Sequence, residues 1–108
     1  MQRSVADPLL LTLQEVVELL KAHNERRWAF RLEGDLERLR EGDTGALEHL
    51  LSAYGGMGSF NDLYLCEQNG HKISIGETSL INEHLRALAS RIWQLARDRQ
   101  RDNEGHVS

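Results

Sequence analysis

Cysteine and long apolar runs are scarce in this 108-residue sequence. The single cysteine, Cys66, excludes an intramolecular disulfide framework and a zinc site built from cysteines alone. The longest apolar run near the N-terminus, Leu9–Leu11, is far too short for the core of a signal peptide or for a membrane-spanning helix. We therefore expect a cytoplasmic protein without a membrane contact.

Positive charge is also in short supply. The chain has 13 lysine and arginine residues against 17 aspartate and glutamate residues, which gives a net charge of −4 at pH 7. Proteins dedicated to DNA or RNA need a basic surface, because contacts with phosphate dominate their affinity. The charge balance therefore predicts a protein that has no nucleic-acid partner.

What remains is the composition of one ordinary globular domain, with 40% hydrophobic and 28% charged residues. We assign this domain to residues 12–101 and predict flexible ends at residues 1–11 and 102–108. Apolar residues at helical spacing predict a first helix over residues 12–23, with Thr12 as its N-cap. A second helix follows Asn24, which we assign as its N-cap, and stops after Glu41.

The second helix and the segment after it carry three further expectations. A glycine in mid-helix, Gly34, costs about 1 kcal/mol relative to alanine, so we expect a bulky group packed across from it. Asp35 and Arg38 are predicted to be exposed charges at helical spacing. A short third helix, capped by Asp43, has an apolar face that reaches Tyr54.

An alternating apolar pattern replaces the helical one after the third helix. Residues 63–67 and 71–75 alternate apolar with other side chains, and they flank Asn69 and Gly70. The Asn-Gly pair between alternating segments is the strongest short-range signal for a hairpin. The pattern predicts two short strands in a β-hairpin that lies over the helices.

The clearest pattern predicts one long helix over residues 77–101. Its apolar residues are spaced four and three apart, as in a heptad seam, and such a seam serves either a bundle core or a dimer interface. The seam consists of Ile81, Leu85, Leu88, Ile92 and Leu95. The predicted fold class is mainly α: a small helical bundle of three helices plus a long C-terminal helix, with a short β-hairpin.

A glycine-rich segment, Gly55–Asp62, connects the third helix to the predicted hairpin. One interpretation is an anion-binding loop, since successive backbone N–H groups can form a concave nest. The other is a tight crossover after a helix C-terminus, with Met57 and Phe60 filling the core. Under the first interpretation, the candidate binding residues are Gly56, Met57, Gly58, Ser59, Asn61, Asp62 and His71.

Reactive side chains do not form a recognisable catalytic or metal motif. His49 and His84 lie in separate predicted helices and could meet across them, but two imidazoles without a suitably spaced carboxylate make a weak metal site. Ser59, Asp62 and His71 are the residue types of a catalytic triad, yet the sequence has no Gly-x-Ser-x-Gly elbow. We therefore expect no metal, no cofactor and no enzymatic activity.

The two tryptophans have two interpretations each. Trp28 follows two arginines, and Trp93 flanks the heptad seam. Exposed pairs of tryptophan and arginine are typical hot spots of protein interfaces, whereas buried tryptophans belong to a core. Both alternatives stay open, and both residues are candidate interface residues.

One segment carries a family resemblance. Residues 55–63 read Gly-Gly-Met-Gly-Ser-Phe-Asn-Asp-Leu, with Leu-Glu-His-Leu-Leu-Ser-Ala-Tyr before them and Asn-Gly-His after them. This sequence resembles a family of small uncharacterised bacterial proteins, a domain of unknown function, over about residues 12–100. The resemblance implies a bacterial cytoplasmic origin and a single domain, and it brings no established activity.

Two functional hypotheses follow. In the first, the protein is non-enzymatic and binds an unidentified protein partner through the loop at residues 55–62 or the exposed flank of the last helix. That partner is a second copy in a homodimer, or a basic toxin surface masked by a small acidic immunity-type protein. In the second, the protein binds a small ligand or an anion, or is a weak enzyme, and uses the loop at residues 55–62.

Overall fold

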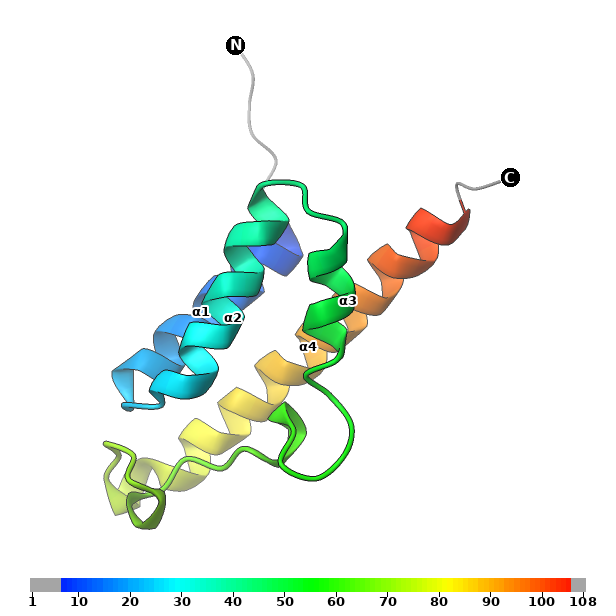
Figure 1. The fold of residues 1–108 in the computed structure, drawn as a ribbon. Helices are drawn as coiled ribbons and strands as arrows, with labels where there is room; N and C mark the ends of the chain where they lie inside the picture. Colours follow the sequence, from blue (N-terminus) through cyan, green and yellow to red (C-terminus); the bar gives the residue numbers. More distant parts are fainter. Residues whose placement is uncertain (1–6, 106–108) are drawn as a thin grey trace.

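A computed structural model of the protein describes residues 7–105, and within them the chain forms a helical bundle (Figure 1). The α-helices are α1 (Pro8–Ala22), α2 (Arg26–Arg40), α3 (Gly45–Leu51) and α4 (Thr78–Gly105). Three single 3₁₀ turns, η1 (Phe60–Asp62), η2 (Glu67–Asn69) and η3 (Ile75–Glu77), interrupt the connection between α3 and α4. Of the predicted flexible ends, positions 1–6 and 106–108 lie outside the described residues, whereas residues 8–11 belong to α1 and residues 102–105 to α4.

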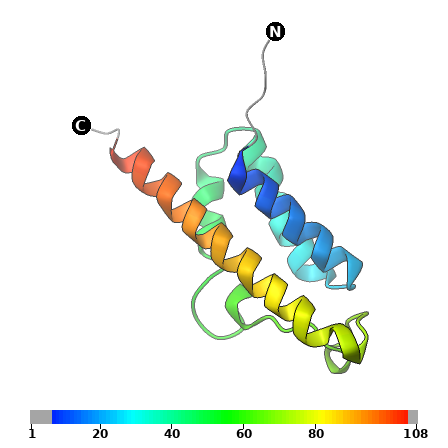
Figure 2. The same ribbon diagram turned by 180° about the vertical axis from the view of Figure 1, so that it is seen from behind.

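The helices surround a common core. Helix α1 packs against α2 and α4, and α3 packs against the same two helices from the other side. Helix α4 runs diagonally past the others, and its C-terminal turns extend beyond them (Figures 1 and 2). No helix in the described part of the chain is long and apolar enough to cross a membrane.

Helix α1 begins at Pro8, four residues before the predicted start. The Asp7 carboxylate caps the helix and accepts a hydrogen bond from the Leu9 N–H at 3.0 Å. Proline suits the first helical position, because its missing N–H would have no partner there. Thr12 is therefore inside the helix, where its hydroxyl donates to the Pro8 carbonyl. The prediction was wrong here because Asp-Pro is the stronger start signal.

Helix α2 also departs from expectation at three positions. Its N-cap is Glu25, whose carboxylate accepts from the Trp28 N–H, while Asn24 adopts a left-handed φ of 64° and ends the preceding turn. Space is open around Gly34, since a Cβ there would meet nothing within 4 Å, so the expected bulky neighbour is not present. Asp35 was predicted to be exposed, but its side chain is wholly buried.

The heptad of α4 is used inside the bundle. Leu85, Leu88 and Ile92 are buried in the core, and Ile81 and Leu95 pack partly buried against it. The seam therefore contacts α1 and α3 of the same chain, as the bundle-core interpretation predicted.

The predicted β-hairpin is wrong: residues 7–105 contain no strand. Asn69 and Gly70 do form a turn, in which Gly70 adopts a φ of 85° and its N–H donates to the Glu67 carbonyl. The flanking segments are extended, and among the described residues a single backbone hydrogen bond joins them, from the His71 N–H to the Cys66 carbonyl at 3.2 Å. The N–H and the carbonyl of Leu65 both bond to the Asn82 carboxamide of α4, and the Lys72 N–H donates to the carbonyl of His23. Groups outside the turn take the other bonds that a hairpin needs, and only the mainly α class is confirmed.

Candidate functional site

The glycine-rich loop is a crossover anchored at its two ends. Gly55, Gly56 and Gly58 all have positive φ, which glycine adopts without a steric penalty. The loop closes where the Phe60 N–H donates to the Ala53 carbonyl at 2.9 Å. The chain between these anchors bulges outward from the helices (Figure 1).

The two side chains predicted to fill the core behave differently. Phe60 is 2% exposed, and its ring centroid lies 5.3 Å from that of Trp28 and 5.8 Å from that of Tyr54. Met57, by contrast, is 94% exposed. The prediction is right for Phe60, which is the inner anchor of the loop, and wrong for Met57, which lies on the exposed bulge.

Some of the predicted binding residues line one shallow depression of about 240 Å³. Gly58, Ser59, Asp62 and His71 are brought together there, but Gly56 and Met57 are not among its lining residues, and Asn61 faces a neighbouring cavity instead. The other lining residues are Glu25, Arg27, Trp28, Leu63, Tyr64 and Asn69.

A histidine–glutamate pair forms one wall of this depression. His71 is buried, and its Nδ1 accepts a hydrogen bond from the Cys66 N–H at 3.0 Å. Since Nδ1 is an acceptor, the ring proton lies on Nε2, which donates to Glu25 Oε1 at 2.7 Å. Both ring nitrogens are therefore occupied: Nδ1 bonds within the segment around η2, and Nε2 joins that segment to the start of α2.

The same contacts weigh against the triad and the anion loop. The His71 ring has no nitrogen left to take a proton from Ser59, whose buried hydroxyl has no hydrogen-bond partner among the described residues. The Gly58 N–H donates to Asp62 Oδ2 at 2.9 Å, so an incoming anion would have to displace a carboxylate of the loop. The His71 ring and the Gly58–Asp62 hydrogen bond therefore both stabilise the folded chain, which favours a structural role for the loop.

The Glu25 carboxyl has a lowered pKa. Its partial burial acts to raise the pKa, but hydrogen bonds from His71 and from the Trp28 N–H outweigh that effect. A carboxyl whose pKa is lower in the folded state stabilises the fold above its unfolded pKa, and this contribution is lost as the pH falls through the folded value.

We therefore expect Glu25→Gln to flatten the acid side of the stability profile. Below the ordinary glutamate pKa of 4.5, the urea midpoint of the wild type should fall more steeply with decreasing pH than that of the variant. Urea midpoints at a series of pH values measure this difference. Glu48→Gln, at an exposed position of α3, is the matched control and should keep the wild-type slope. Equal slopes for Glu25→Gln and wild type would contradict the assignment.

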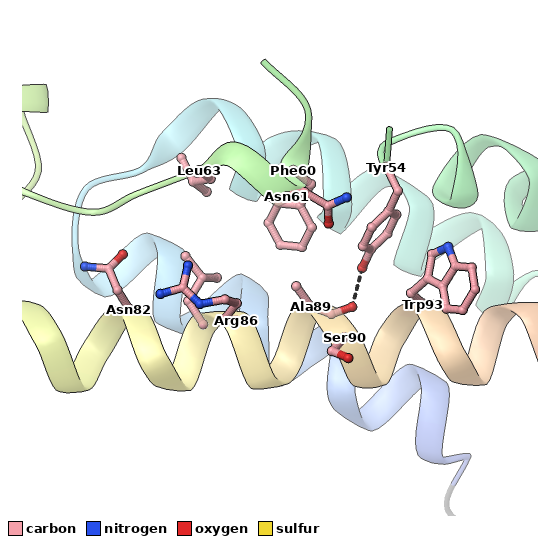
Figure 3. A pocket seen from close by; sticks show the side chains of 10 residues that line it. Tyr54, Phe60, Asn61, Leu63, Asn82, Arg86, Ala89, Ser90 and Trp93 are labelled. Atoms are coloured by element: carbon pink, nitrogen blue, oxygen red, sulfur yellow. Dashed lines mark hydrogen bonds between the residues drawn. The ribbon is translucent and has the colours of Figure 1, made fainter. Parts of the chain in front are cut away.

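A second cavity, of about 250 Å³, lies beside α4 (Figure 3). Tyr54 and Phe60 form its aromatic wall, and the Tyr54 hydroxyl donates to the Ala89 carbonyl at 2.6 Å. Burial raises the pKa of the Tyr54 phenol, so this hydroxyl stays protonated. Across from this wall, α4 contributes Arg86 and Trp93. The remaining lining residues are Asn61, Leu63, Asn82, Leu85, Ala89 and Ser90.

The two candidate interface tryptophans differ in accessibility. Trp28 is buried against Phe60, with the Arg31 guanidinium 5.4 Å from its ring centroid. Trp93 is 39% exposed at the rim of the second cavity, and the Arg97 guanidinium lies 5.3 Å from its ring centroid. Only Trp93 offers its ring to another molecule.

His49 and His84 do not come together as a metal site. His49 Nδ1 lies 2.6 Å from Asp35 Oδ1, and His84 Nε2 lies 3.4 Å from Glu15 Oε2. The prediction that His49 and His84 meet is therefore wrong. Over the residues with described side chains, no group of three or more histidines, cysteines, aspartates or glutamates is placed to hold a metal ion.

Sequence reasoning missed the buried carboxylate of Asp35. Its Oδ1 accepts from Arg38 and lies against His49, while its Oδ2 has no partner in the described part of the chain. A signal was present, because Asp35 lies at helical spacing from Leu32 and Trp28 on the buried stripe of α2. Asp35 joins α2 to α3 through its contact with His49.

A family model described as Domain of unknown function (DUF6966) matches residues 21–74. The match runs from the end of α1 to the segment before η3, so it includes the glycine-rich loop and excludes α4. No curated protein and no solved structure matches the chain.

Proposed function

The chain belongs to the family of the domain of unknown function DUF6966, and we propose that it is a non-enzymatic protein that binds a partner protein along the exposed flank of α4. The observation that carries this proposal is the half-exposed ring of Trp93 beside an open cavity. Tryptophan and arginine are the residue types that most often dominate the binding energy of protein interfaces.

The exposed side chains of this flank share one face of α4. Arg86, Ser90, Trp93 and Arg97 are spaced four, three and four residues apart, which places them in one row along a helix. All of them are exposed. We call this row, together with the adjoining cavity, the α4 flank.

The potentially reactive side chains are already hydrogen-bonded within the fold, which supports a binding role over a catalytic one. His71 uses both ring nitrogens within the fold, and the Tyr54 hydroxyl is held by a backbone carbonyl. General acid–base catalysis needs such a group within reach of a substrate proton. In the α4 flank the accessible groups are two guanidinium groups, a carboxamide, a hydroxyl and an aromatic ring, which suit recognition.

The cellular location of the protein is also part of the proposal. We place the protein in the bacterial cytoplasm, as its sequence resemblance implies and as its one free cysteine permits. A second copy in a homodimer and a different protein are both versions of the same function. The basic toxin surface of an immunity-type complex does not suit this flank, because Arg86 and Arg97 would repel it.

Site-directed photo-crosslinking tests the proposal. A photoreactive amino acid in place of Ser90 should give a discrete adduct with one protein in cells of the source organism. Mass spectrometry identifies that protein, and the complex is then reconstituted from the two purified chains. The same amino acid in place of Arg91 is the matched control, because that position lies about 100° around the helix axis from Ser90 and about 140° from Arg86. Adducts of equal pattern and yield from both positions would contradict a partner on the α4 flank.

A further inference from the structure

Resting on the proposed function, we infer that the α4 flank binds an acidic segment of its partner, with one apolar side chain of that segment seated in the cavity between Tyr54 and Trp93. The inference combines the local charge of α4, the size of the cavity and the spacing of the arginines.

The charge of α4 is opposite to that of the rest of the chain. Between Arg86 and Arg101 the helix has five arginines and one aspartate, a local net charge of +4, whereas the whole chain has −4. Arg99 is bound by Asp7, and Arg101 by Asp98, all at 2.7 Å. Among the described residues, Arg86 and Arg97 form no ion pair, so both guanidinium groups are available to carboxylates.

The cavity is large enough to hold one side chain of a partner. Its volume of about 250 Å³ is below the roughly 300–1,000 Å³ typical of sites for small-molecule ligands. Its aromatic wall offers apolar contact, and the Tyr54 hydroxyl is already bonded within the fold. Such a seat favours an apolar anchor over a polar ligand.

The spacing of Arg86 and Arg97 sets the form of the bound segment. Arg86 and Arg97 are eleven residues apart, which is about 16 Å along an α-helix. An extended chain covers that distance in about five residues. A segment with an apolar residue at its centre and acidic residues two or three positions to either side therefore matches both arginines and the cavity.

The charge of the rest of the molecule favours a peptide over a nucleic acid. Outside the stretch from Arg86 to Arg101 the chain carries a net charge of −8, which repels a long polyphosphate. A short acidic segment needs only the local positive stretch. Exposed ion pairs of this kind contribute to specificity and to the association rate.

Peptide binding tests the inference directly. The probe is a fluorescein-labelled synthetic peptide with a central phenylalanine and flanking glutamates, and the readout is fluorescence anisotropy with the purified protein. We expect a micromolar Kd, weakened at least tenfold by Arg86→Glu or Arg97→Glu. Arg91→Glu makes the same charge change on another face of α4 and should leave the Kd unchanged. Circular dichroism and thermal unfolding confirm that each variant is folded.

A second peptide, with alanine in place of the central phenylalanine, tests the cavity. It should bind at least tenfold more weakly than the first peptide. Equal affinity of the two peptides, an equal effect of Arg91→Glu and Arg86→Glu, or tighter binding of a single-stranded RNA of similar length would each overturn the inference. So would a dimer in light scattering that Arg86→Glu dissociates, since a second copy would then occupy the flank.

The outcome separates this inference from the proposed function. If the Ser90 photo-crosslink identifies a partner whose affinity is lost in Trp93→Ala but unchanged in Arg86→Glu, the proposed function stands and the acidic segment is wrong. If neither substitution affects any reconstituted complex, the proposed function itself fails.

Discussion

Phe60→Ala is expected to lower the free energy of unfolding by about 3–5 kcal/mol, the usual cost of truncating a buried phenylalanine. The side chain is 2% exposed and contacts two other aromatic rings, Trp28 and Tyr54. Its removal takes away those contacts and leaves a void, because α2 and α4 on either side cannot close over it without moving. Phe60 is also the inner anchor of the glycine-rich loop, so the loss should spread to Gly55–Ser59.

Urea unfolding followed by circular dichroism measures this change, with two controls on the same loop. Met57→Ala removes a side chain of similar size that is 94% exposed, and it should change stability by less than about 0.5 kcal/mol. Phe60→Leu keeps most of the buried volume and should cost clearly less than Phe60→Ala. Comparable losses for Met57→Ala and Phe60→Ala would show that the loop does not pack as described.

The Phe60 experiment also bears on the cavity beside α4. Phe60 forms part of its wall, so the alanine variant should enlarge it. If the cavity seats an apolar side chain of a partner, the enlarged form should accept a central tryptophan in the acidic peptide better than the wild type does. The comparison requires conditions in which the variant is still folded.

Asn82→Ala is expected to lower the free energy of unfolding by about 2–4 kcal/mol, although the change removes only a carboxamide. Asn82 is 2% exposed; its Oδ1 accepts from the Leu65 N–H at 2.7 Å, and its Nδ2 donates to the Leu65 carbonyl at 2.8 Å. The side chain therefore takes the place of a neighbouring strand for one residue. Without it, a buried donor and a buried acceptor lose their partners, at about 1–3 kcal/mol each.

Asn61→Ala is the matched control for this change. Asn61 is exposed, lines the same cavity and forms no hydrogen bond with another described side chain or backbone group, so its loss should be within about 0.5 kcal/mol of neutral. Both variants are compared by the urea midpoint and by hydrogen exchange of the Leu65 amide. A loss below about 1 kcal/mol for Asn82→Ala, with the Leu65 amide still protected, would mean that another group takes over.

The helical part of the fold followed from local pattern. The stripe of α1, the end of α2 near Glu41 and the heptad of α4 all depend on groups within a few residues of each other, and such short-range contacts can be read along a chain. Where prediction missed by a few residues, as at Pro8, two local signals competed. The candidate site was harder to predict. The sequence does not indicate that Trp28 is buried and that Trp93 is half exposed.

The failed hairpin shows where pattern stops being informative. The Asn-Gly turn formed as its local chemistry requires, yet the segments beside it found partners elsewhere, Leu65 on a side chain 17 positions further along and Lys72 on a carbonyl of α1. Periodicity reports which side chains are apolar, and it contains no information on which distant group satisfies a backbone N–H.

For this chain, composition and periodicity were enough to establish a mainly α domain with one dominant C-terminal helix. Packing between helices far apart in sequence decided the other features: the burial of Asp35, the exposure of Met57 beside a buried Phe60, and the cavity that Trp93 borders. The reason is that burial and hydrogen bonding depend on distances in space, and a pattern along the chain constrains such distances only over about one or two turns of a helix.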